Sequence, residues 1–122
     1  MEGALMMKTS LVLLTITALG GVVMAIIRFG SNANPPSWLA MLHGLLAGSA
    51  LTLLLYAYFT TGLPALACWA LLIFLIAAVG GAFLNLGHHA KALPLPKAIV
   101  LVHGVAAVVG YVLLLLAVMA PR

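Results

Sequence analysis

Acidic residues are almost absent from this chain of 122 residues, in which Glu2 is the only one. Charged residues of both signs make up 5% of the sequence, whereas about a quarter of an ordinary soluble domain is charged. This shortage excludes a soluble globular enzyme. Five basic residues give a net charge of +4, which is too little for a patch that neutralises nucleic-acid phosphates, so we expect no nucleic-acid partner. The lone cysteine, Cys68, excludes a disulfide within the chain.

Apolar residues take the place of the missing charges, at 66% of the sequence and a mean hydropathy of +1.34. A membrane-spanning helix needs about 20 mostly apolar residues, and no stretch here alternates with the period of two that barrel strands show. Four runs qualify, and turn residues separate them: Leu11–Ile27, Trp38–Phe59, Ala65–Leu86 and Ala98–Ala120. The sequence therefore predicts an all-α, four-helix transmembrane bundle in one membrane domain, residues 1–122. We expect a multi-pass protein of the bacterial inner (cytoplasmic) membrane, in contact with the lipid bilayer.

The two halves of the chain resemble each other when they are shifted by 60 residues. The ranges 11–58 and 71–118 then align without a gap. Leucine and alanine matches are uninformative in such a composition, but less common residues also coincide: Gly20-Gly21 with Gly80-Gly81, Pro36 with Pro96, and His43-Gly44 with His103-Gly104. The alignment predicts two parallel helix-pair repeats, related by a pseudo-two-fold axis along the membrane normal.

Two histidines occupy equivalent places in the predicted repeats. His43 and His103 each follow their proline by seven residues, which is a depth of about 10 Å at the rise of an α-helix. An ionisable side chain inside a membrane span indicates a functional site, because burying it without a partner is costly. A hydrogen bond to Thr15, Thr17 or Asn85 is the alternative, purely structural use.

A shared ligand is the interpretation that the matched pair favours. Copper or zinc would need three or four protein donors, but no buried carboxylate is present and Cys68 lies near the opposite face. A haem iron needs two axial ligands, one on each side of the ring. We therefore expect one haem b with His43 and His103 as its iron ligands, while a copper-binding membrane protein stays open.

Paired glycines lie at the same predicted depth as the histidines. Gly20, Gly21, Gly80 and Gly81 are about 11 Å inside the first and third helices. A flat porphyrin needs neighbouring helices without side chains in its way, so we expect these glycines to form its walls. Close helix packing is the alternative, since small residues commonly serve it in membranes.

These residues resemble those of four-helix membrane cytochromes of b type, such as cytochrome b561-like proteins and the haem-bearing anchors of respiratory dehydrogenases. The resemblance implies histidine ligands on different helices and glycines that flank the ring. It also implies a respiratory or other electron-transport role. Cytochrome b561-like proteins usually hold two haems with four buried histidines, whereas this chain has two histidines at membrane depth, so one haem is expected.

Basic residues gather on the predicted haem face, where Arg28, His88, His89 and Lys91 follow the first and third helices. They would pair with haem propionates, although basic residues flank most membrane helices. His88 and His89 could instead contact a quinone or form a second ligand site. The positive-inside rule, at three basic residues against two, favours a cytoplasmic haem face.

The function expected from these observations is electron transfer by a membrane subunit. Its partner would be quinone or a larger redox protein, because the chain has no soluble domain and no visible catalytic set. A cofactor-free structural or assembly subunit of a larger membrane complex is the alternative. Whether haem-dependent quinone chemistry makes the chain an enzyme, and whether it forms a homo-oligomer, stays open.

Overall fold

Four long α-helices and one short 3-10 turn form the computed structural model, which describes residues 2–121. The elements are α1 (Glu2–Ser31), α2 (Ser37–Thr60), α3 (Ala65–Gly87), η1 (His89–Lys91) and α4 (Lys97–Met119). All four α-helices are long and apolar enough to cross a membrane. The predicted all-α, four-helix architecture is confirmed, and it is compatible with a multi-pass membrane protein.

Prolines mark where three of the helices begin. Pro36, Pro64 and Pro96 each directly precede the first residue of α2, α3 and α4, with extended backbone angles. Proline has no N–H to donate inside a helix, so a helix starts after it more easily than it continues through it. The turn between α2 and α3 contains Gly62 at φ +76°, a conformation that glycine adopts without a steric penalty.

The first helix starts nine residues before the apolar run that predicted it. Tertiary contacts explain the extension. Met7 and Ser10 are buried, and the Ser10 hydroxyl donates a 3.1 Å hydrogen bond to the carbonyl oxygen of Ala50 on α2. Gly3 lies so close to Thr61 that a Cβ atom at position 3 would be 2.6 Å from its Oγ1 atom. The first turns of α1 are therefore packed against the end of α2.

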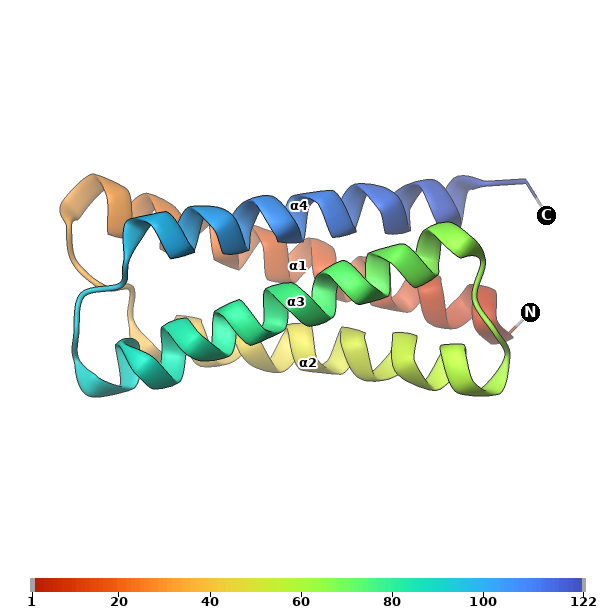
Figure 1. Cartoon of the computed structure of the whole chain (residues 1–122), viewed down its shortest axis with the longest axis horizontal. Coiled ribbons are helices and arrows are strands. Elements are labelled where there is room, and N and C mark those ends of the chain that lie inside the picture. Colours follow the sequence, from red (N-terminus) through yellow and green to blue (C-terminus); the bar gives the residue numbers. More distant parts are fainter. Residues whose placement is uncertain (1, 122) are drawn as a thin grey trace.

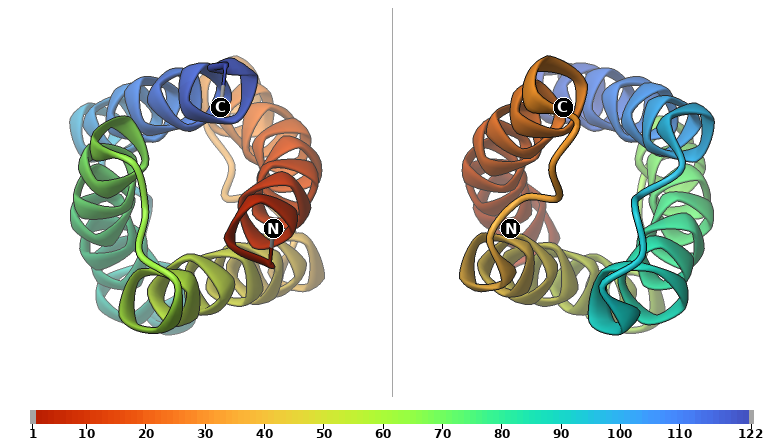
Figure 2. Two further views of the ribbon diagram at one scale, coloured as in Figure 1. Left: turned by 90° about the vertical axis from the view of Figure 1, so that its right-hand side faces the viewer. Right: turned by 90° about the vertical axis from the view of Figure 1, so that its left-hand side faces the viewer.

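The helices run up, down, up and down around a square, so that both termini lie at the same end of the bundle (Figure 1). Viewed along the bundle, α1 lies between α2 and α4, while α2 and α4 are diagonally opposite (Figure 2). Contacts are dense within the α1–α2 hairpin and within the α3–α4 hairpin, and sparser between the two hairpins. The fold is thus two closely packed helical hairpins set side by side.

The hydrophobic core fills the half of the bundle near the termini. Leu54 on α2 and Leu114 on α4 are completely buried in that half. The cluster extends along α1 as far as Leu14 and along α3 as far as Phe74, and there it ends. The part of the bundle that contains His43 and His103 begins about one helical turn beyond Leu14 and Phe74.

The two hairpins also match in burial. Residues 41–50 and 101–110 show the same succession of buried, half-buried and exposed positions. Leu54 and Leu114, the two fully buried leucines, are themselves 60 residues apart. Burial thus follows the same 60-residue offset, and the repeat itself stays a prediction.

Candidate functional site

The two membrane-level histidines lie next to each other inside the bundle. His43 on α2 and His103 on α4 come from diagonally opposite helices, and both are half-buried. Their ring centres are 6.2 Å apart and their ring planes are inclined by 63°. The fold therefore brings together the two residues that the sequence placed at one depth.

Each imidazole is held by a backbone carbonyl of the preceding helix. Nδ1 of His43 donates to the Thr17 oxygen at 2.9 Å, and Nδ1 of His103 donates to the Ala77 oxygen at 2.7 Å. The two acceptors are again 60 residues apart. A carbonyl oxygen can only accept, so Nδ1 carries the proton in both rings and Nε2 keeps a lone pair for another partner.

The structure also shows where sequence reasoning missed the histidine partners. The structural alternative in the sequence was a side-chain partner such as Thr15 or Thr17, but the Thr17 hydroxyl donates to the Leu13 oxygen within its own helix. The Thr15 hydroxyl similarly bonds to the Leu11 oxygen and also contacts the Tyr111 hydroxyl. The acceptor for His43 is instead the main chain of Thr17. The only signal in the sequence is the equal spacing of 26 residues between acceptor and histidine in both hairpins.

The glycines lie against the imidazoles themselves. A Cβ atom at Gly21 would lie 3.0 Å from Cε1 of His43, and one at Gly81 would lie 3.1 Å from Cε1 of His103. At Gly80 the nearest atom is Nδ1 of His103, at 3.7 Å. At Gly20 it is a methyl carbon of Leu39, at 3.9 Å. Three of the four expected glycines thus border a histidine, and Gly21 and Gly81 leave room for the rings.

The separation of the rings suits two imidazoles that share one metal ion. An imidazole nitrogen lies about 2.0–2.1 Å from a bound metal such as Zn²⁺. A nitrogen is also about 1.1 Å from the centre of a five-membered ring with bonds of about 1.33 Å. Two rings on opposite sides of one ion therefore have centres roughly 6.3 Å apart. The observed 6.2 Å is close to this value, and it also falls within the roughly 4.5–7 Å of two rings in ordinary edge contact; the Nδ1 bonds leave Nε2 as the ring nitrogen without a carbonyl partner.

A metal site completed by protein side chains alone is not found in the part of the chain that the structure describes. Residues 2–121 contain no group of three or more His, Cys, Asp or Glu side chains that could hold a metal ion. The α3 helix begins at the end of the bundle that carries the termini (Figure 1), Cys68 is its fourth residue, and the Cys68 thiol contacts the Leu63 oxygen. The donor set at the centre of the bundle therefore consists of two imidazoles.

The rim residues connect the two loops on the histidine side. Arg28 is 8% exposed and donates from Nε to the Leu95 oxygen at 2.9 Å. Nε2 of His89 donates to the Pro35 oxygen at 2.7 Å. Since a guanidinium has five N–H donors, the bond to Leu95 leaves Arg28 able to bind further groups. The predicted pairing of the rim with haem propionates stays a prediction.

Two further rim residues differ in their surroundings. The Nδ1 atom of His88 is buried and has no hydrogen-bond partner among the described residues, and the ring lies edge-on to Phe83 at 5.1 Å. Lys91 is exposed at the end of η1. The 60-residue shift makes His88 equivalent to Arg28, but the two side chains have different neighbours.

The loops are joined by asparagine as well as by the basic residues. The Asn34 side chain donates to the Leu93 oxygen at 2.7 Å and accepts from the Leu95 N–H at 3.0 Å. Lys97 bonds to the Asn32 side chain. Asn32 and Asn34 are among the turn residues that separate the first two apolar runs. In the structure they tie the α1–α2 connection to the α3–α4 connection.

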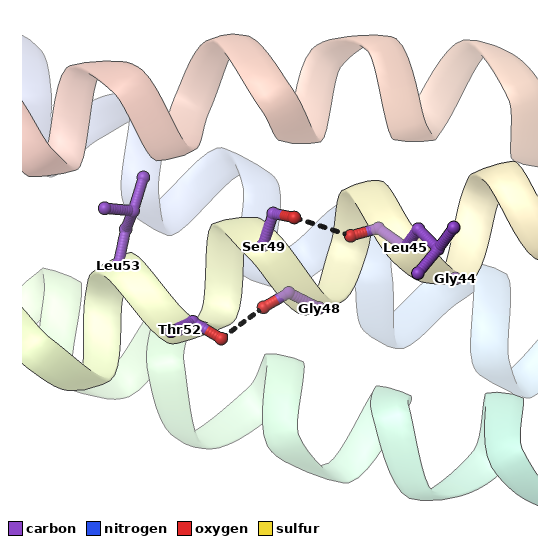
Figure 3. Close-up of a pocket in the computed structure, with 6 residues that line it drawn as sticks. All are labelled: Gly44, Leu45, Gly48, Ser49, Thr52 and Leu53. Carbon is purple, nitrogen blue, oxygen red and sulfur yellow. Dashed lines mark hydrogen bonds between the residues drawn. The ribbon is translucent and has the colours of Figure 1, made fainter.

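Two hollows are lined by residues of the first hairpin. One, of about 260 Å³, lies between α1 and α2 and is lined in part by Gly20, Leu39 and His43. The other, of about 550 Å³, follows one side of α2 (Figure 3). Its two hydroxyl side chains, Ser49 and Thr52, donate to carbonyl oxygens one turn earlier in the same helix. The second hollow contains none of the predicted site residues.

Comparison with family models, with curated proteins and with solved structures finds no match to this chain. The interpretation of the site therefore depends on its own residues and geometry.

Proposed function

We propose that this protein is a membrane electron-transfer subunit that holds one haem b between His43 and His103. The observation that carries the proposal is the ring separation of 6.2 Å, in an arrangement where both Nδ1 atoms are already occupied by carbonyl oxygens. Metal-binding histidines commonly donate their second ring nitrogen to such an acceptor, which fixes the tautomer and the orientation of the ring. The matched bonds on both sides support His43 and His103 as the residues that would hold the haem.

Different residues of the chain would have different roles at such a site. Haem supplies one-electron chemistry at its iron when it is bound. The carbonyl oxygens of Thr17 and Ala77 hold the Nδ1 protons and so keep both Nε2 lone pairs available. The hydrophobic core that ends at Leu14 and Phe74 closes the bundle toward the termini and excludes water from that side. The opposite side carries Arg28 and the connecting loops.

Electron exchange is proposed from the end of the bundle that carries the α1–α2 and α3–α4 connections, with quinone or a larger redox protein as the partner. The histidines are near that end, because each is the seventh residue of a helix, α2 or α4, that begins there. The bacterial cytoplasmic membrane is the proposed location, with the loops facing the cytoplasm. This orientation depends on a narrow excess of basic residues.

A visible absorption spectrum tests the proposal directly. The full chain is purified in mild detergent from cells that are supplied with haem, and its spectrum is recorded before and after addition of dithionite. We expect the sharp reduced-state bands of a low-spin b-type cytochrome, with about one haem per chain. A colourless protein, or a spectrum that dithionite does not change, overturns the proposal.

A cofactor-free structural subunit is the second candidate, and a specific observation favours it. Each histidine already bonds to a carbonyl oxygen of the neighbouring helix, so the imidazoles can join α2 to α1 and α4 to α3 without a ligand. A colourless preparation that loses stability when His43 or His103 is replaced by alanine would support this candidate.

A further inference from the structure

Gly21 and Gly81 each share one carbonyl oxygen with a histidine. In an α-helix the N–H of residue i bonds to the carbonyl of residue i−4, so Gly21 is paired with Thr17 and Gly81 with Ala77. These are the same two oxygens that accept the Nδ1 protons of His43 and His103. Each imidazole therefore lies against the helical turn that begins at its acceptor and ends at the glycine.

The space for this contact exists only because both residues lack a Cβ atom. A methyl group at Gly21 would lie 3.0 Å from Cε1 and 3.5 Å from Nδ1 of His43. At Gly81 the corresponding distances to His103 are 3.1 Å and 3.6 Å. Carbon atoms in contact prefer separations of about 3.5–4.0 Å, so either ring would have to move back by a few tenths of an ångström. We expect that movement to lengthen the bond from Nδ1 to its carbonyl oxygen.

We infer that Gly21 and Gly81 are positioning residues. They leave space for the two imidazoles to reach the carbonyl oxygens of Thr17 and Ala77. The resulting hydrogen bonds set the electron-donating strength of the two Nε2 ligand atoms. This inference depends on the proposed haem site for its redox consequence, but its structural part concerns the imidazoles alone. It assigns the glycines a role beyond providing space for a porphyrin.

The expected chemical effect follows from the hydrogen bond. A carbonyl that accepts the Nδ1 proton increases the basicity of the ring, and the more basic ligand favours the higher oxidation state of the metal. Weakening the bond should therefore raise the reduction potential. Removing such an outer partner changes metal binding on the order of tenfold. For a one-electron couple, a tenfold change in the relative binding of the two oxidation states corresponds to about 59 mV.

The test compares the same substitution at two kinds of glycine. Gly21→Ala and Gly81→Ala place a methyl group against an imidazole. Gly44→Ala and Gly104→Ala are matched controls, because they directly follow His43 and His103 while a Cβ atom there meets nothing within 4 Å. Each variant addresses one hairpin, so if one does not fold the other still tests the inference.

The first measurement needs no haem. Histidine ¹⁵N NMR of the full-length apoprotein in detergent reports which ring nitrogen carries the proton. We expect the Nδ1–H form for both histidines in the unchanged protein, a loss of that preference at His43 in Gly21→Ala and at His103 in Gly81→Ala, and no change in the controls. A preference for Nε2–H in the unchanged protein, or unaltered signals in both test variants, overturns the inference.

The second measurement is the reduction potential of the haem-loaded protein, followed by its visible spectrum. We expect the reduction potential to shift in the positive direction in Gly21→Ala and Gly81→Ala, by an amount approaching about 59 mV. The potentials of both controls should equal that of the unchanged protein. A loaded protein whose potential is unchanged in the test variants refutes the positioning role and leaves the proposed haem site intact. A protein that never binds haem refutes the proposed function, and the NMR result then decides the positioning role by itself.

Discussion

The guanidinium of Arg28 donates to the carbonyl oxygen of Leu95 at 2.9 Å, and both residues are buried. The bond connects the end of α1 with the segment that leads into α4, so it joins the two hairpins on the side of the histidines. Asn34 makes two more bonds to the same segment. Because contacts between the hairpins are otherwise sparse, these bonds add to what joins the two hairpins on the histidine side.

Replacing Arg28 by alanine should lower the free energy of unfolding by about 1.5–3 kcal/mol, because a buried hydrogen bond from a charged group is lost and the Leu95 carbonyl is left unpaired. Chemical unfolding in detergent, followed by far-UV circular dichroism, measures the change. Lys91→Ala is the control, since Lys91 is exposed and should stay within about 0.5 kcal/mol of the unchanged protein. Equal stability of the two variants would contradict the role assigned to Arg28.

Alanine at His43 or at His103 should abolish or greatly weaken haem retention, because ligation by two histidines needs both of them. The visible spectrum of each purified variant, together with its haem content, measures the effect. His88→Ala and His89→Ala are the comparison, and both should keep the low-spin spectrum because they lie in the rim. If the spectrum persists after both central histidines have been replaced, the iron ligands are other residues.

Leucine at Gly80 should reduce haem occupancy more than leucine at Gly20. The Gly80 site borders Nδ1 and Cβ of His103, whereas the nearest atom at Gly20 is a flexible methyl group of Leu39. Overpacking a tight site costs about 1–3 kcal/mol, and at position 80 the His103 ring takes the strain. Haem content per folded chain is the measurement, and equal occupancy in the two variants would argue against this difference. Both variants should still insert into the membrane, since their hydrophobicity does not fall.

Leu54→Ala and Leu114→Ala should each destabilise the protein by about 2–5 kcal/mol while leaving the wavelengths of the haem bands unchanged. Both leucines are completely buried, and they lie in the half of the bundle away from the histidines. Leu45, which is 68% exposed on the outside of α2, provides the control substitution. A spectral shift in either core variant would mean that the ligand extends into the leucine-packed half.

Much of the architecture could be predicted from the sequence because it depends on local properties. Four apolar runs interrupted before Pro36, Pro64 and Pro96 are sufficient for four helices, since run length and proline act within a single segment. The juxtaposition of His43 and His103 was also predictable. Equal distances from the preceding prolines place them at one depth, and the helix count places them on helices that run in the same direction.

Only the tertiary structure decided which atoms meet at that depth. These helices are apolar on nearly every side, so their periodicity does not tell which face turns inward. The rotation of each helix about its axis selects the carbonyl of Thr17 as the partner of His43, and it places Gly21 against the ring. The early start of α1 and the bonds between the loops also depend on tertiary contacts. Ser10 and Asn34 gain their partners from segments distant in the chain, and no local pattern indicates those contacts.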